Sequence, residues 1–222
     1  MNESELKKYW QTANEKLEMN LIINKINTDE IRQLKIYHFI SGMKVIKFFT
    51  LIFGIFWVGL GAAILSNIYQ YQYTNANKFF IFSASIQVVL TFIAILVYLY
   101  QIITIYSLDI TEPVLKTQEK LSGLRSSTLL VTRILFLQLP VWTTFYWNES
   151  MIENGNLLLW IIQALVTLSF TFAALWLFFN IKFENRDKKW FRLIFEGKEW
   201  IPLMRAMELS EQIEKYKFEK ES

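Results

Sequence analysis

The chain has 222 residues, of which 53% are hydrophobic and 17% are aromatic, and it contains no cysteine. The lack of cysteine excludes a disulfide framework, a thiol nucleophile and a metal site with cysteine ligands. The net charge is +3, and both tails mix acidic with basic residues, whereas nucleic-acid binding needs a concentrated basic face. We therefore expect no nucleic-acid partner.

The first 44 residues are polar and mixed in charge. Apolar residues recur at helical spacing near the start, at Leu6, Trp10, Ala13 and Leu17. The stretch NKINTDE, residues 24–30, predicts a break, and Asn27 followed by Glu30 suits the start of a second helix. Residues 1–44 therefore predict an amphipathic N-terminal helical segment in the cytoplasm. It is not a cleavable signal peptide, so the first span acts as an uncleaved anchor.

Three long stretches carry no charge. Residues 48–77 and 79–108 are 30 residues each, and residues 154–181 are 28. A helix needs roughly 20 apolar residues to cross the hydrocarbon core of a bilayer. The stretches therefore predict membrane spans at about 45–69, 79–106 and 157–183.

A fourth span is predicted at about 128–147, where the only charge is Arg133. This arginine lies near the start of the segment, from which its side chain can extend back to the interface. An even number of spans also keeps the two charged tails on one side of the membrane. The fold class that we expect is all-α: a polytopic membrane protein with a four-helix transmembrane bundle over residues 45–183.

The C-terminal segment, residues 184–222, is amphipathic. Its apolar cluster consists of Trp190, Phe191, Ile194 and Phe195, with lysines and arginines on both sides. This composition is typical of a helix that lies in the headgroup region of a membrane. The cluster is open to two interpretations, an interfacial anchor or a surface for a protein partner.

The distribution of basic residues predicts the orientation. Of the 23 lysines and arginines, eight lie in residues 1–47, four in 107–133 and ten after 181, which leaves only Lys78. By the positive-inside rule, both termini and the middle loop face the cytoplasm. We therefore expect a multi-pass protein of the cell's inner (plasma) membrane, N-in and C-in, with the lipid bilayer as its surroundings.

A few polar residues and one proline stand inside the predicted spans. Arg133 is either a boundary arginine that reaches the interface or a contact for a lipid headgroup or another anion. Gln87, Gln138 and Gln163 are candidates for hydrogen bonds between helices. Pro140 removes a helical hydrogen bond and is expected to bend its span. For Gln138 and Pro140, polar packing and a functional kink both remain open.

The predicted spans lack the residue types that catalytic, metal-binding and proton-coupling sites commonly use. The only histidine is His38, and no Asp, Glu or His lies inside a predicted span. A histidine-based metal site, a mid-membrane carboxylate for proton coupling and a catalytic constellation are therefore not predicted. We expect no catalytic residue, no metal and no cofactor, and we do not expect an enzyme.

Two segments resemble short membrane proteins of Bacteroidota, namely ELKKYWQTANEKLEMNLIINKI and DITEPVLKTQEKLSGLRSSTLLVTRILFLQLPVW. In the second, an acidic residue and a proline precede an amphipathic Leu/Gln-rich stretch, and an arginine and a proline follow in the next span. The resemblance covers about a quarter of the chain. Members are often encoded near alternative sigma factors or other regulators, which implies a regulatory, anti-sigma-like role. The resemblance implies no site residues.

Two functions of different classes follow. The first is a regulatory or interaction protein that presents its cytoplasmic helices to a protein partner. The alternative is a subunit of a transporter or channel, in which Gln87, Gln138, Pro140 and Gln163 line a path through a homo-oligomer. A purely structural membrane protein is the third possibility.

Overall fold

The computed structural model describes residues 3–109, 111–197 and 199–221, and their side chains other than those of 4–6, 9, 25–26, 29, 114 and 213–221. Over these residues the chain forms helices and no strand, which confirms the all-α class. In chain order the helices are α1 (Glu3–Ser41), α2 (Met43–Asn67), η1 (Ile68–Gln72), α3 (Lys78–Tyr106), α4 (Val114–Phe136), α5 (Leu139–Thr144), α6 (Glu149–Glu153), α7 (Leu157–Asn180), η2 (Phe183–Asn185), α8 (Lys189–Phe195) and α9 (Trp200–Glu221).

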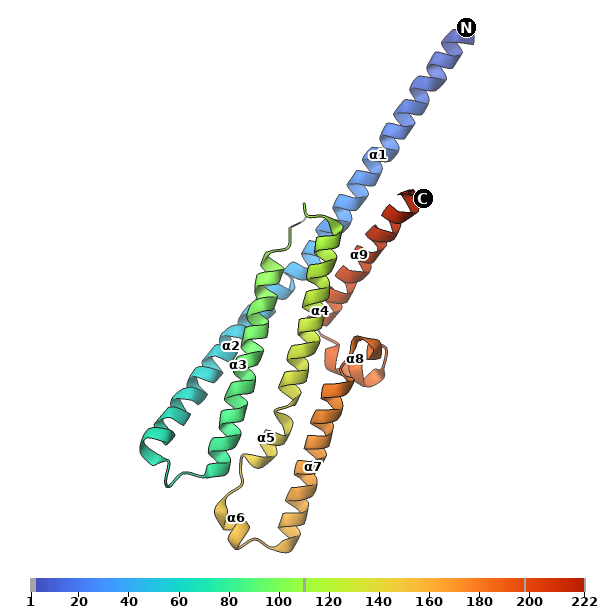
Figure 1. The fold of residues 1–222 in the computed structure, drawn as a ribbon. Helices are drawn as coiled ribbons and strands as arrows, with labels where there is room; N and C mark the ends of the chain where they lie inside the picture. The colour runs from blue at the N-terminus through green and yellow to red at the C-terminus, as the bar shows by residue number, and fades with distance from the viewer. Residues whose placement is uncertain (1–2, 110, 198, 222) are drawn as a thin grey trace.

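The helices form an elongated molecule (Figure 1). Along its length, α2 packs against α3, and α3 packs against α4 and α5. Both α4 and α5 also pack against α7. At one end, α9 packs along α1, so that both chain termini lie at the same end. The other end carries the turn after η1 and the short helix α6.

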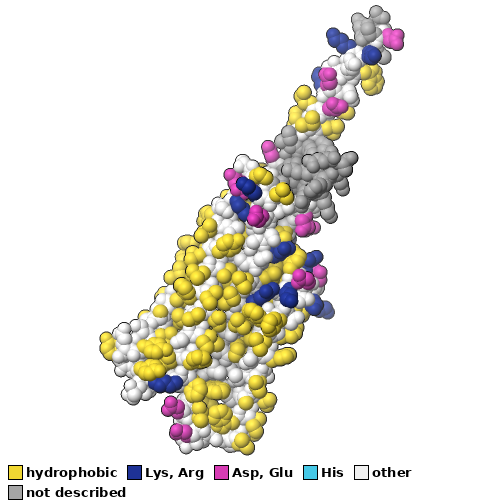
Figure 2. All heavy atoms as spheres, viewed as in Figure 1, with side chains coloured by type: hydrophobic (Ala, Val, Ile, Leu, Met, Phe, Trp, Pro, Cys, Tyr) yellow, Lys and Arg dark blue, Asp and Glu magenta, His cyan; other side chains and the backbone are white. Residues whose placement is uncertain are grey.

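Three helical stretches are long and apolar enough to cross a membrane: Glu30–Gln72, Lys78–Tyr106 and Leu157–Asn180. They match the three spans that the charge-free stretches predict, except that the third helix ends at Asn180 instead of residue 183. In the most apolar 18 residues of each stretch, only 11%, 33% and 6% are buried inside the protein. Figure 2 shows hydrophobic side chains over most of this region, with charged side chains mainly toward the end that holds α1 and α9. Apolar surface of this extent is typical of a region that lipid surrounds.

The fourth predicted span is not one long helix. The described residues contain three helices that are long and apolar enough to cross a membrane rather than four, and the predicted segment is interrupted at Leu137 and Gln138, between α4 and α5. Pro140 has no N–H to donate to the carbonyl of Phe136, which is the last residue of α4. It stands instead in the first turn of α5, where a helix needs no such donor. Helix α4 also begins well before residue 128 and includes charged residues.

The predicted break at residues 24–30 is wrong, since α1 is continuous from Glu3 to Ser41. The polar residues that indicated a turn are accommodated in the helix. The hydroxyl of Thr28 donates to the carbonyl of Asn24 over 2.7 Å, so it bonds within its own helix instead of ending it. Gly42 between α1 and α2 keeps a right-handed helical conformation, so α1 leads directly into the first span.

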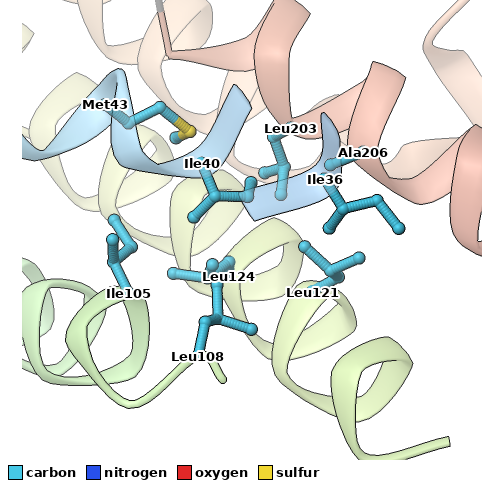
Figure 3. Packing of buried hydrophobic residues seen from close by; sticks show 9 residues of the cluster. All are labelled: Ile36, Ile40, Met43, Ile105, Leu108, Leu121, Leu124, Leu203 and Ala206. Carbon is cyan, nitrogen blue, oxygen red and sulfur yellow. The ribbon is translucent and has the colours of Figure 1, made fainter. Parts of the chain in front are cut away.

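A hydrophobic core closes the end of the span region from which α1 and α9 extend (Figure 3). Its residues are Ile36, Ile40, Met43, Ile105, Leu108, Leu121, Leu124, Leu203 and Ala206. They come from α1, α2, α3, α4, α9 and the residues after α3. Each buried aliphatic side chain contributes about 1.5–3 kcal/mol of hydrophobic stabilisation. This core therefore fixes α9 against the ends of the spanning helices.

Candidate functional site

A fully buried lysine stands at the centre of the site. Lys47 follows Ile36, Ile40 and Met43 at helical spacing, so it lies on the same buried face of the continuous α1–α2 helix. Its ammonium group donates to Oε1 of Gln101 over 2.6 Å and to Oε2 of Glu199 over 2.9 Å. The nitrogen also lies 4.9 Å from the centre of the Tyr98 ring. An ammonium has three donors, and these three groups give each of them an acceptor.

The polar contacts continue from Lys47 through α3 to α4. Gln101 on α3 is buried, and its Nε2 donates to the hydroxyl of Ser127 on α4 over 3.1 Å. Ser127 in turn donates to the carbonyl of Leu124 over 3.0 Å. We call Lys47, Tyr98, Gln101, Ser127 and Glu199 the Lys47 network. It joins α2, α3 and α4 to the residue just before α9.

The Lys47 network holds its elements together strongly, because Lys47 is buried more deeply than its partner Glu199. Lys47 is fully buried, whereas the side chain of Glu199 is 24% exposed. A buried ammonium is stable only when its donors are satisfied, because its desolvation is expensive. Loss of one partner of such a pair costs about 3–5 kcal/mol, since the other charge stays behind in a site of low dielectric constant. The network therefore fixes the start of α9 on the spanning helices.

Sequence reasoning missed the Lys47 network. By sequence alone, Lys47 is one of the eight basic residues that precede the first charge-free stretch. Its spacing from Ile36, Ile40 and Met43 is the signal that places it on a buried face. Glu199 gives no local signal, because it stands 152 positions away in a mixed-charge tail.

Arg133 binds protein backbone in the structure. Its Nε donates to the carbonyl of Ile181 over 2.6 Å, and Ile181 is the buried residue that caps the C-terminus of α7. The last carbonyls of a helix have no partner within it, and the C-terminus carries partial negative charge. Arg133 supplies both a donor and a positive charge there. A lipid or anion contact through its other donors stays a prediction.

The side chain of Gln138 bonds to Thr91, which stands one turn after Gln87 on α3. Nε2 of Gln138 donates to the Thr91 hydroxyl over 3.0 Å, and that hydroxyl donates to the main-chain carbonyl of Gln87 over 2.8 Å. The chain of bonds joins the break between α4 and α5 to α3. It gives the side chain of Gln138 a partner at the point where the helix is interrupted.

Gln163 and Pro140 are both bonded to Thr143 of α5. Nε2 of Gln163 on α7 donates to the Thr143 carbonyl over 2.8 Å. The Thr143 hydroxyl donates to the Pro140 carbonyl over 2.7 Å and lies 3.1 Å from the Thr167 hydroxyl. Both glutamine contacts serve helix packing, and the structure does not place the glutamines against one another.

The aromatic residues of α8 do not form one exposed surface. Phe191 and Phe195 are buried, their ring centres lie 4.3 Å apart, and they share a core with Leu129 and Ile181. Trp190 is half-buried and packs edge-on against Trp176 of α7 at 4.9 Å. The seven-residue helix folds back on α4 and α7, so it uses its aromatic side for protein contacts. Ile194 also packs against this core.

The arrangement defines a class of protein. It is helical, three of its described helices are long and apolar enough to cross a membrane, and an ion pair with a buried lysine holds the C-terminal segment against them. No family model, curated protein or solved structure matches the chain.

Proposed function

We propose that the protein is a multi-pass protein of the inner (plasma) membrane that presents α1 and α9 to a cytoplasmic protein partner in a regulatory role. The observation that carries this proposal is the exposed apolar face of α1. Trp10, Leu17 and Leu21 are 70%, 60% and 61% exposed.

These three residues stand at i, i+7 and i+11, so they share one face of the helix. Among the side chains of α1 that the structure describes, Ile36 is the first that is buried. At 1.5 Å per residue, the helix before that point is about 50 Å long. A long helix with a row of large apolar residues in water is the form in which amphipathic helices bind grooves or other helices.

The proposed topology has four crossings with both termini in the cytoplasm. The fourth crossing combines the second half of α4 with α5. Interrupted helices occur at membrane depth when they are packed within protein. Here the side chain of Gln138 bonds to Thr91 of α3, and Gln163 of α7 bonds to the Thr143 carbonyl of α5. The inward orientation is supported by the 22 of 23 lysines and arginines that would face the cytoplasm, and by α1 and α9 lying together.

The proposal is tested by capture from cells with the full-length chain in mild detergent. The variant Trp10→Glu/Leu17→Glu places two charges on the exposed face. The control Gln11→Glu/Asn14→Glu adds the same charge at exposed polar positions of α1. We expect a soluble protein in stoichiometric amount with the native chain and the control, and its loss with the variant.

Two results would contradict the proposal. One is an identical set of captured proteins with the variant and the native chain. The other is a self-associated complex that conducts ions in reconstituted bilayers, which would favour the transporter or channel alternative.

A further inference from the structure

A groove with a volume of about 530 Å³ lies between η2 and α8 on one side and α9 on the other. Its apolar lining includes Phe183, Phe195, Trp200 and Met204. Charged residues of both signs complete the lining. The groove thus combines an apolar surface with a charged rim, as a site for an amphiphilic molecule does.

Charges of both signs surround the groove. Arg192, Arg205, Glu196 and Glu208 all line it and are exposed. Across the part of the chain that the structure describes, none of these four has an oppositely charged group within 4.0 Å. The groove therefore offers unpaired groups of both signs to a ligand that carries both charges.

Two of the arginines that line the groove lie over aromatic rings. The guanidinium carbon of Arg186 lies 4.4 Å from the centre of the Phe183 ring, and that of Arg205 lies 6.0 Å from the centre of the Phe39 ring. A cation–π contact takes up no oxygen acceptor, so the N–H donors of these guanidinium groups stay open to oxygen ligands. The exposed pair of Arg186 with Asp187, at 3.9 Å, takes little of this capacity.

The groove opens where a spanning helix ends. Phe183 lines it and follows Asn180, the last residue of α7, within one turn. In Figure 1, α8 lies against the end of α7 and beside the start of α9. Figure 2 shows basic and acidic side chains gathered at this level, next to the hydrophobic surface. A site at this depth faces lipid headgroups.

We propose that this groove binds the headgroup of an aminophospholipid such as phosphatidylethanolamine. The phosphodiester accepts hydrogen bonds from Arg192 and Arg205, and the primary ammonium donates to Glu196 and Glu208. The glycerol and the first methylenes contact Met204 and its apolar neighbours. Phosphatidylglycerol carries only the negative charge and would leave the carboxylates unmatched. Phosphatidylcholine has no N–H to donate.

The test uses the full-length chain, delipidated in a maltoside detergent and titrated with the three phospholipids on identical acyl chains. Native mass spectrometry measures the bound lipid. We expect phosphatidylethanolamine to bind about fivefold more tightly than either of the others, and the variant Arg205→Gln/Glu208→Gln to weaken it about tenfold. The control Lys7→Gln/Glu15→Gln removes the same two charges from exposed positions of α1 and should change nothing.

A thermal melt without lipid shows whether each variant is folded. Should the double variant be unfolded, Glu208→Gln alone is decisive and should abolish the preference for phosphatidylethanolamine over phosphatidylcholine. Three results would overturn the proposal: equal or tighter binding of phosphatidylglycerol, equal binding of phosphatidylcholine, or undiminished phosphatidylethanolamine binding in the folded variant.

Discussion

Lys47 and Glu199 stand 152 positions apart in the chain and form a salt bridge of 2.9 Å. The lysine belongs to the first spanning helix, and the glutamate immediately precedes α9. Their contact makes the C-terminal segment part of the fold rather than a free tail. Any movement of α9 away from the spanning helices must first separate these two charges.

Removing either partner of this pair should destabilise the protein unequally. Lys47→Met leaves Glu199, which is partly exposed and can be hydrated, so we expect a loss of about 3 kcal/mol. Glu199→Met leaves a fully buried ammonium and should cost more. The double variant should recover much of the loss, because no buried charge remains. Unfolding in detergent, measured as a double-mutant cycle, checks this order.

Additive losses in the double variant would show that the two charges do not stabilise the folded protein through each other. The pair Lys7→Met and Glu15→Met, at exposed positions of α1, is the matched control. It should change stability by no more than about 0.5 kcal/mol.

The three long spans could be predicted from sequence because they depend on local composition: a charge-free stretch is apolar whatever it packs against. The Lys47 network could not, since Gln101, Ser127 and Glu199 reach Lys47 only through the tertiary fold. The helix break near Pro140 has a local cause, because proline has no backbone N–H to donate to the carbonyl four residues earlier. Its exact place, at Leu137 and Gln138, depends on neighbours such as Thr91.

The aromatic residues of α8 show why one pattern fits two structures. An aromatic cluster beside lysines and arginines is equally suited to a membrane interface and to a small core at the end of a spanning helix. Phe191 and Phe195 are buried because α4 and α7 supply Leu129 and neighbouring apolar residues. No property of the segment itself reports that those partners are close.

Gly61 is the glycine of α2 at which a side chain would approach α3 most closely. A methyl group at Gly61 would lie 2.7 Å from Cγ2 of Val88, whose branched side chain has little freedom to move away. We expect Gly61→Ala to destabilise the protein by about 1–3 kcal/mol through overpacking. Thermal unfolding of the detergent-solubilised protein measures the effect.

Gly59 is the matched control, since a methyl group there would meet no atom within 4 Å. Gly59→Ala should be neutral or slightly stabilising. Equal losses at the two glycines would mean that backbone flexibility, rather than contact between α2 and α3, is what both positions provide.

The proposed topology makes a direct prediction for reporter fusions. Fusions near residues 75 and 152 should report an external location, and fusions at 118 and 222 an internal one, because nearly all lysines and arginines lie on the second side. An external signal at 118 would contradict four crossings. A location of residue 152 on the same side as residue 118 would mean that the α4–α5 segment does not carry the chain across the membrane.

Arg133 should stabilise the C-terminus of α7 through its charge and its hydrogen bond to Ile181. Arg133→Gln keeps a donor but removes the charge, and we expect it to cost about 1–2 kcal/mol. Arg133→Lys keeps both the charge and a donor that can reach a single carbonyl, so it should cost less than half as much. Arg133→Glu places a negative charge beside the negative end of the helix and should be the most damaging. Thermal unfolding of the three variants in one detergent measures this order.

A loss for Arg133→Lys as large as that for Arg133→Gln would show that the guanidinium has a second, geometrically specific partner, as the anion-contact interpretation of this residue requires.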